Sequence, residues 1–231
     1  MAHLKTLVNV SYLRMAIKYY EKALEVQFKL NKKAAIASNL LTIGDSYNKI
    51  GAFKAALKYY KKLIKKDNSS KKNLAIYHKI QLIYSSKGDF KGAIHYLKKI
   101  ETIQIHLKNF DKLVKVYNKI IEYYDNIGSP KLVLAYCSKL LKLEKHLDTL
   151  PPTVLNNIYK KRGLYLFLLG NYESALIVYR KLEKKLNQKD DLCAIFSIIK
   201  AIYHIKNNRN LVQHYTLKQK KIGCPSFDFF I

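Results

Sequence analysis

Lysine gives this sequence its main capacity to bind a charged ligand. The chain has 43 Lys and Arg residues against 16 Asp and Glu, a formal net charge of +27. Only Arg14, Arg162, Arg180 and Arg209 are arginine. A protein that grips phosphates usually carries more arginine, because the planar guanidinium group binds two oxygens at once. The lysine excess leaves two explanations open: a biased composition, or an acidic partner such as a protein, a nucleic acid or a membrane surface.

Histidine and cysteine, which often serve in catalysis and metal binding, occur singly. The seven histidines form no H-E-x-x-H motif, and the sequence has no G-x-S-x-G motif and no glycine-rich phosphate loop. Cys137, Cys193 and Cys224 lie far apart and lack the spacing of a zinc or redox site. We therefore predict that the protein is not an enzyme, has no catalytic residues, and binds no metal and no cofactor.

The cysteines and the apolar segments predict a cytoplasmic location. Widely spaced cysteines in odd number are typical of reduced structural thiols. No apolar stretch approaches the roughly 18 to 20 residues that span a bilayer. The first ten residues lack the long apolar run and the cleavage site of a secretory signal. We expect no membrane span.

The helices that position these side chains are predicted from a six-residue segment that begins and ends with a small residue and recurs along the chain. We call this segment the frame. The copies begin 37 to 42 residues apart, a period typical of stacked helical hairpins. They lie at Ser11–Ala16, Gly51–Ala56, Gly88–Ala93, Gly128–Val133, Gly170–Ala175 and, more weakly, Asn207–Val212.

Apolar residues at three- and four-residue spacing predict one helix before each glycine and one after it. Each glycine suits the end of the first helix, where a positive φ is needed. The expected pairs are 34–49 with 53–66, 73–86 with 90–104, 110–126 with 130–147, and 153–169 with 172–186. On the first helices, Gly44 and Gly163 are expected to let Ala56 and Ala175 of the partner helix approach closely.

These positions resemble the tetratricopeptide repeat family in its longer variant of 37 to 42 residues. The match is carried by Leu40, Ile43, Gly44, Tyr47, Gly51, Ala56 and Tyr60, and again by Tyr159, Gly163, Gly170, Ala175, Tyr179 and Leu182. The resemblance covers roughly residues 11 to 218. It implies an all-α, right-handed superhelical solenoid of about five full hairpins and a partial N-terminal one.

The domain prediction is a single repeat domain over residues 1–221, followed by an apolar tail over residues 222–231. Phe227, Phe229 and Phe230 make the tail apolar. Because the ends of a repeat array need a cap, we expect the tail to fold back on the last hairpin, or an end of the array to mediate self-association.

The resemblance implies that the first helices line a concave groove that binds a peptide of a partner. The groove positions combine asparagines and lysines with a few apolar side chains, a set suited to a peptide backbone, a carboxylate and an apolar anchor. They are Leu41, Asp45, Asn48, Lys49, His78, Leu82, Ser85, Lys115, Asn118, Glu122, Asp125, Asn157, Lys160, Leu164, Phe167, Ser197, Ala201 and His204.

One lysine recurs at the same place in every copy, near the end of the second helix. There a cation meets the carbonyl end of the helix dipole, a stabilisation of roughly 0.3 to 1 kcal/mol. We therefore interpret these residues as structural. This lysine ridge consists of Lys22, Lys62, Lys99, Lys139, Lys181 and Lys218.

The leading hypothesis is a non-enzymatic adaptor or scaffold that binds a peptide segment of another protein in the groove, an acidic segment being one candidate. Two alternatives stay open. One is sequence-nonspecific binding of nucleic acid through the lysine-rich surface, and the other is a receptor for a short signalling peptide.

Overall fold

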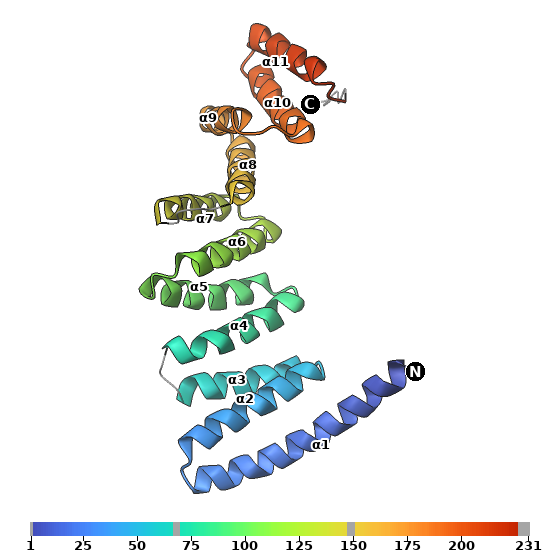
Figure 1. Ribbon diagram of the computed structural model, residues 1–231, viewed down its shortest axis with the longest axis vertical. Helices are drawn as coiled ribbons and strands as arrows, with labels where there is room; N and C mark the ends of the chain where they lie inside the picture. The colour runs from blue at the N-terminus through green and yellow to red at the C-terminus, as the bar shows by residue number, and fades with distance from the viewer. Residues whose placement is uncertain (1, 67–69, 147–150, 226–231) are drawn as a thin grey trace. The chain divides into compact units, whose positions relative to one another are not determined.

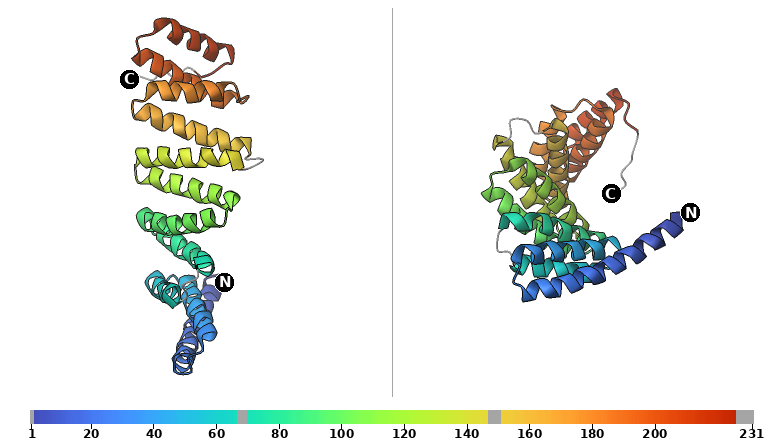
Figure 2. Two further views of the ribbon diagram at one scale, coloured as in Figure 1. Left: turned by 90° about the vertical axis from the view of Figure 1, so that its left-hand side faces the viewer. Right: turned by 60° about the horizontal axis from the view of Figure 1, so that its bottom comes forward.

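The computed structural model describes residues 2–66, 70–146 and 151–225, and the regular structure in these ranges is entirely helical (Figure 1). The chain divides into two compact units, Met1–Asn109 and Phe110–Ile231, each described by itself. Within each unit, consecutive helices pack as antiparallel hairpins, as Figure 2 shows from two further directions. The predicted all-α repeat architecture is confirmed.

The first unit contains two complete hairpins preceded by one long helix. Tyr59 donates a hydrogen bond of 2.6 Å to Glu21 of the long helix, and Tyr47 donates another of 3.2 Å. The long helix runs without a break through Ser11, which stands where the other strong copies have a glycine. The partial N-terminal copy is thus a single helix. The helices are α1 (Ala2–Lys29), α2 (Lys33–Lys49), α3 (Phe53–Lys66), α4 (Ser70–Ser86) and α5 (Phe90–His106).

The second unit contains three hairpins, and the expected helix pairs recur in it with shifts of a few residues at their ends. A single 3-10 turn, Leu143–His146, extends the second helix of the first pair. The helices are α6 (Phe110–Asn126), α7 (Pro130–Lys142), α8 (Pro152–Leu168), α9 (Tyr172–Glu183), α10 (Lys189–Ile205) and α11 (Arg209–Lys221).

The hairpin turns explain why the frame begins with glycine. Gly51 and Gly170 each have a φ of 75°, a left-handed conformation in which a side chain is strained. Asn207 occupies the same position in the weak last copy with a φ of 55°, and asparagine tolerates that region better than most residues. The small residues that end the four frames beginning with glycine, Ala56, Ala93, Val133 and Ala175, are fully buried, whereas Ala16 and Val212 are half-buried.

The expected role of the two first-helix glycines needs a correction. A Cβ atom built on Gly44 would lie 2.7 Å from the ring of Tyr60, and one built on Gly163 would lie 2.7 Å from the ring of Tyr179. The close approach that glycine permits is therefore that of a tyrosine ring, not that of Ala56 or Ala175. The larger side chain reaches across the glycine and brings its hydroxyl to the first helix.

The prediction of reduced thiols is wrong for two of the three cysteines. Cys193, near the start of α10, and Cys224, just after α11, form a disulfide. They are 31 residues apart in sequence, but the α10/α11 hairpin folds the chain back on itself and brings them together. Cys137 is free and buried.

The domain prediction remains a prediction, since the two units are placed only individually. Ile222 packs against the core of the second unit, and Cys224 is bonded to α10. Residues 226–231 of the predicted tail, including Phe227, Phe229 and Phe230, lie outside the described residues.

Candidate functional site

The predicted groove residues lie on the first helices of the five hairpins, α2, α4, α6, α8 and α10, and form two separate sets, one for each unit. In the first unit, Asp45 and Asn48 are half-buried, whereas Lys49 and His78 are exposed. Leu82 is unusual for an apolar side chain because 59% of its surface is exposed. The described contacts of Leu41 and Ser85 are with their own unit, and Ser85 donates to the Leu82 carbonyl within α4.

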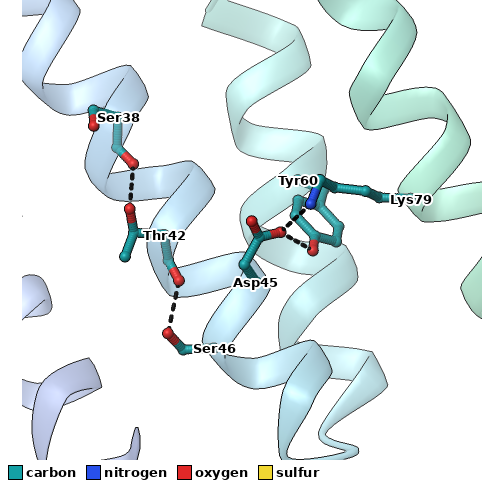
Figure 3. A network of polar contacts seen from close by, with 6 residues as sticks. All are labelled: Ser38, Thr42, Asp45, Ser46, Tyr60 and Lys79. Carbon is teal, nitrogen blue, oxygen red and sulfur yellow. Dashed lines mark hydrogen bonds and ion pairs between the residues drawn. The ribbon is translucent and has the colours of Figure 1, made fainter.

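Asp45 is the centre of a closed polar network in the first unit (Figure 3). The Tyr60 hydroxyl donates to Asp45 Oδ1 at 2.6 Å, and Lys79 Nζ of α4 donates to the same oxygen at 2.8 Å. Burial raises the pKa of Tyr60, and the hydrogen bond to Asp45 raises it further, so this hydroxyl stays a donor. Asp45 is thus committed to its own chain and joins three helices.

A similar set of groups occurs in the second unit between α6 and α8. Asp125 accepts hydrogen bonds from Lys161 and from the Tyr165 hydroxyl. Burial by itself would raise the pKa of Asp125, but these two donors outweigh it and the pKa is lowered. Glu122 pairs with Lys119 at 3.0 Å on the same helix. Two of the predicted groove carboxylates are therefore also engaged within the chain.

A cavity of about 400 Å³ lies between α8 and α10 in the second unit. Its lining is mainly apolar, and its polar groups come from the predicted groove positions and from residues that sequence reasoning missed. Lys160 forms an ion pair of 2.5 Å with Asp191 at this cavity. The lining residues are Asn157, Lys160, Lys161, Leu164, Tyr179, Asp191, Ala194, Ile195 and Ile198. We call this space the α8–α10 cavity.

Among the residues that line the cavity, Tyr179 is unusual because its hydroxyl is buried without a hydrogen bond to any of the described residues. Only 1% of the surface of Tyr179 is exposed. Burial raises its pKa, which keeps the group protonated. Its position was visible in the sequence as a frame tyrosine, but the frame could not show that its hydroxyl would lack an acceptor.

A second cavity of about 440 Å³ adjoins the first on α10, with Ala194 and Ile198 common to both linings. The predicted groove residue Ser197 lines it, together with the disulfide of Cys193 and Cys224. The disulfide therefore forms part of the wall of this face.

The remaining predicted groove residues are not brought to these cavities. Phe167 is partly buried against the core and packs on Tyr172, with ring centroids 5.8 Å apart. Lys115 and His204 are exposed on α6 and α10, and Asn118 and Ala201 are half-buried on the same two helices. Their role in binding stays a prediction.

The lysine ridge lies on aromatic rings, a structural role beyond the one expected from the helix dipole. Among the described contacts, five of the six ammonium groups, all but that of Lys22, lie over a tyrosine face, where the quadrupole of the ring attracts a cation. Lys181, for example, also donates to the Tyr159 hydroxyl at 2.8 Å. The distances from nitrogen to ring centroid are 5.5 Å for Lys62 on Tyr59, 5.3 Å for Lys99 on Tyr96, 4.4 Å for Lys139 on Tyr136, 4.6 Å for Lys181 on Tyr159 and 4.9 Å for Lys218 on Tyr215.

In the part of the chain that the structure describes, no group of three or more His, Cys, Asp or Glu residues could hold a metal ion. Within the same residues, no helix combines the length and the apolar character that crossing a bilayer requires.

Solved structures place this architecture among the helical-repeat solenoids. The C-terminal part of a TPR repeat-containing protein from Cytophaga hutchinsonii is 18% identical, with a TM-score of 0.54 over 92% of this chain and 95% of that one. BtubC (BKLC) from P. vanneervenii is 13% identical, with a TM-score of 0.52 over 98% of each chain. YrrB, described as a TPR protein with an unusual peptide-binding site, is 20% identical, with a TM-score of 0.51 over 88% of this chain and 91% of that one.

The sequence supports the same conclusion at one repeat. Residues 37–69 match the family model for the tetratricopeptide repeat. No curated protein matches the sequence. Residues 37–69 thus match one tetratricopeptide repeat, and the described residues have the fold of the repeat solenoids named above.

Proposed function

We propose that this chain is a non-enzymatic scaffold that binds a peptide segment of another protein on the face formed by α8 and α10. The α8–α10 cavity carries the proposal, because three residues predicted to line a groove, Asn157, Lys160 and Leu164, line it together. Its volume, about 400 Å³, is within the range of ligand pockets.

The chemistry of the cavity fits a peptide. Leu164, Ile195 and Ile198 offer an apolar surface for one anchoring side chain. Asn157 provides both a donor and an acceptor for the backbone of an extended segment, and Lys160 provides a cation. YrrB, which shares the fold, is described as having a peptide-binding site, and that description is compatible with the same use of the fold here.

Site-specific photo-cross-linking tests this function. A photoreactive phenylalanine analogue replaces Asn157, which is exposed on α8, and in a matched control replaces Ile177, which is 71% exposed on α9. We expect a partner to be cross-linked from position 157 and not from position 177. Equal labelling from both positions, or none from position 157, would contradict the proposal.

No specific observation favours either of the two alternatives, nucleic-acid binding or a receptor for a short signalling peptide. The rings beneath five ridge lysines account for those residues without a nucleic acid. A short signalling peptide would use the same cavity and differs from a protein segment only in its source. The cytoplasmic location stays a prediction, and the Cys193–Cys224 bond removes the part of it that rested on reduced thiols.

A further inference from the structure

Tyr60 and Tyr179 occupy the same position in two hairpins of the chain. Each lies nine residues after the glycine of its hairpin turn. Each ring packs across a glycine of the first helix, Gly44 or Gly163, at the same 2.7 Å from the place of a missing Cβ. The two hydroxyls therefore reach equivalent places beside the first helix.

The residues that meet these hydroxyls differ. Tyr60 finds the carboxylate of Asp45, which follows Gly44, and Asp45 is also held by Lys79 of the next hairpin. In the second unit the residue after Gly163 is Leu164, and Ile198 stands at the position of Lys79. Both apolar residues line the α8–α10 cavity. The acceptor and the cation of the first unit are thus replaced by the walls of a cavity.

The substitution leaves Tyr179 with an unpaired donor beside that cavity. A buried hydroxyl without an acceptor is unfavourable, and a ligand that brings an acceptor removes the penalty. A cation is also present, because Lys160 lies one helical turn before Leu164 and lines the same space. Lys160 is paired with Asp191, and the neighbouring Lys161 with Asp125, so the charged groups around the cavity are two lysines and two carboxylates.

We propose that the α8–α10 cavity binds a side-chain carboxylate of an internal Asp or Glu in a partner segment, flanked by an apolar residue. The carboxylate takes the place that Asp45 fills in the first unit: it accepts from the Tyr179 hydroxyl and shares Lys160 with Asp191. The apolar neighbour packs on Leu164, Ile195 and Ile198. The equivalent position of the first unit holds a carboxylate, that of Asp45, and the net charge of +27 on the chain attracts an acidic segment at long range.

This inference rests on the proposed function and is tested with a displayed library of random hexapeptides, selected on the intact chain. We expect the selected peptides to share an Asp or Glu next to Leu, Ile or Phe. Tyr179→Phe removes only the unpaired hydroxyl, so the variant is expected to fold normally and to bind these peptides at least tenfold more weakly. Replacing the acidic residue of a selected peptide by its amide should cause a similar loss.

Leu164→Asp is the second variant, because it supplies the missing carboxylate from within the chain. Leu164 is 40% exposed, so the substitution is compatible with folding. We expect the new aspartate to pair with Tyr179 and to abolish peptide binding. Ile177→Asp is its matched control: Ile177 is 71% exposed on α9, is not a predicted groove residue, and does not line the α8–α10 cavity. It should leave binding unchanged.

The outcomes separate the two proposals. Peptides that lack acidic residues, yet lose binding with Leu164→Asp and keep it with Tyr179→Phe, would overturn the carboxylate inference and leave the peptide-binding function standing. Peptides unaffected by either variant, or no selected peptide at all, would overturn the inference, and in the latter case the proposed function with it.

Discussion

Two hairpins of this chain, α2/α3 and α8/α9, are built on the same frame of glycine, alanine and tyrosine and end in opposite states. In the first, the tyrosine hydroxyl donates to Asp45, and Lys79 donates to the same carboxylate oxygen. In the second, the same hydroxyl has no partner and borders a cavity. The side chains at two positions, Asp45 and Lys79 against Leu164 and Ile198, distinguish a polar network within the chain from a cavity, which we propose binds a ligand.

Exchanging the residue after the glycine should have the largest effect on this difference. Asp45→Leu gives the first hairpin the side chain of the second and leaves the Tyr60 hydroxyl and the Lys79 ammonium without their acceptor. We expect a loss of about 2 kcal/mol in the free energy of unfolding, since hydrogen bonds to a charged group contribute about 1.5 to 3 kcal/mol. Denaturant titration monitored by circular dichroism measures it. An unchanged midpoint would mean that the network in Figure 3 contributes nothing.

Replacing each of the two glycines by alanine should have the next largest effect, and the loss of stability should differ between the two hairpins. Gly44→Ala forces the added carbon against a Tyr60 ring that Asp45 holds in place, and overpacking costs typically 1 to 3 kcal/mol, partly offset by the roughly 1 kcal/mol by which alanine favours a helix. We expect a net loss of about 1 to 2 kcal/mol. For Gly163→Ala we expect a loss near zero, because Tyr179 can shift toward the cavity. Thermal denaturation of both variants compares them, and equal losses would count against this difference in freedom.

Removing the hydroxyl oxygen from each tyrosine should change the stability by a smaller amount, and in opposite directions in the two hairpins. Tyr60→Phe deletes a hydrogen bond, and we expect it to lower the stability by about 1 kcal/mol. Tyr179→Phe deletes a buried donor that has no partner, and we expect no loss or a slight gain. Both variants can be compared by the same unfolding measurement. A clear loss with Tyr179→Phe would show that this hydroxyl has an acceptor in solution.

Acidic pH should have the smallest effect on stability, through the second cluster of tyrosine, lysine and carboxylate, in which Lys161 and Tyr165 donate to Asp125. The pKa of Asp125 is lowered in the folded chain, so its contribution is present above the ordinary pKa of 3.8 and is lost as the pH falls through the lowered value. We therefore expect Asp125→Asn to be less stable than the parent chain at neutral pH and to approach it below about pH 3.8. A stability difference that does not change between pH 6 and pH 3 would contradict this.

Most of the fold, but only part of the candidate site, could be predicted from the sequence. The spacing of Gly51, Gly88, Gly128 and Gly170 located the hairpin turns, because few residues tolerate a positive φ. The same spacing put Asn157, Lys160 and Leu164 on one helix face, which is a local property. Asp191 and Ile198 come from another hairpin, and their approach to α8 depends on helix packing that no local pattern encodes.

Partners of polar groups were the hardest features to anticipate. Asp45 was predicted to be a groove residue, but its bond to Tyr60 depends on how far a tyrosine reaches across Gly44. The Cys193–Cys224 bond was missed because pairing depends on the return path of the α10/α11 hairpin, and not on spacing in the sequence. The rings under the ridge lysines were visible in the sequence as tyrosines three residues before most of these lysines, a signal that could have been used.

The disulfide makes the last hairpin a covalent ring that encloses the whole of α11. The described contacts of α11 are mainly with α10, and a helix with few packed neighbours opens more easily than one packed on both sides. Here fraying of α11 cannot release the chain beyond it, because Cys224 is tethered to Cys193 on α10. In the chain-entropy picture, closing a loop of this length restricts the unfolded state by roughly 3 to 4 kcal/mol. Reduction would therefore loosen this end of the second unit, next to the α8–α10 cavity, before the rest of the array.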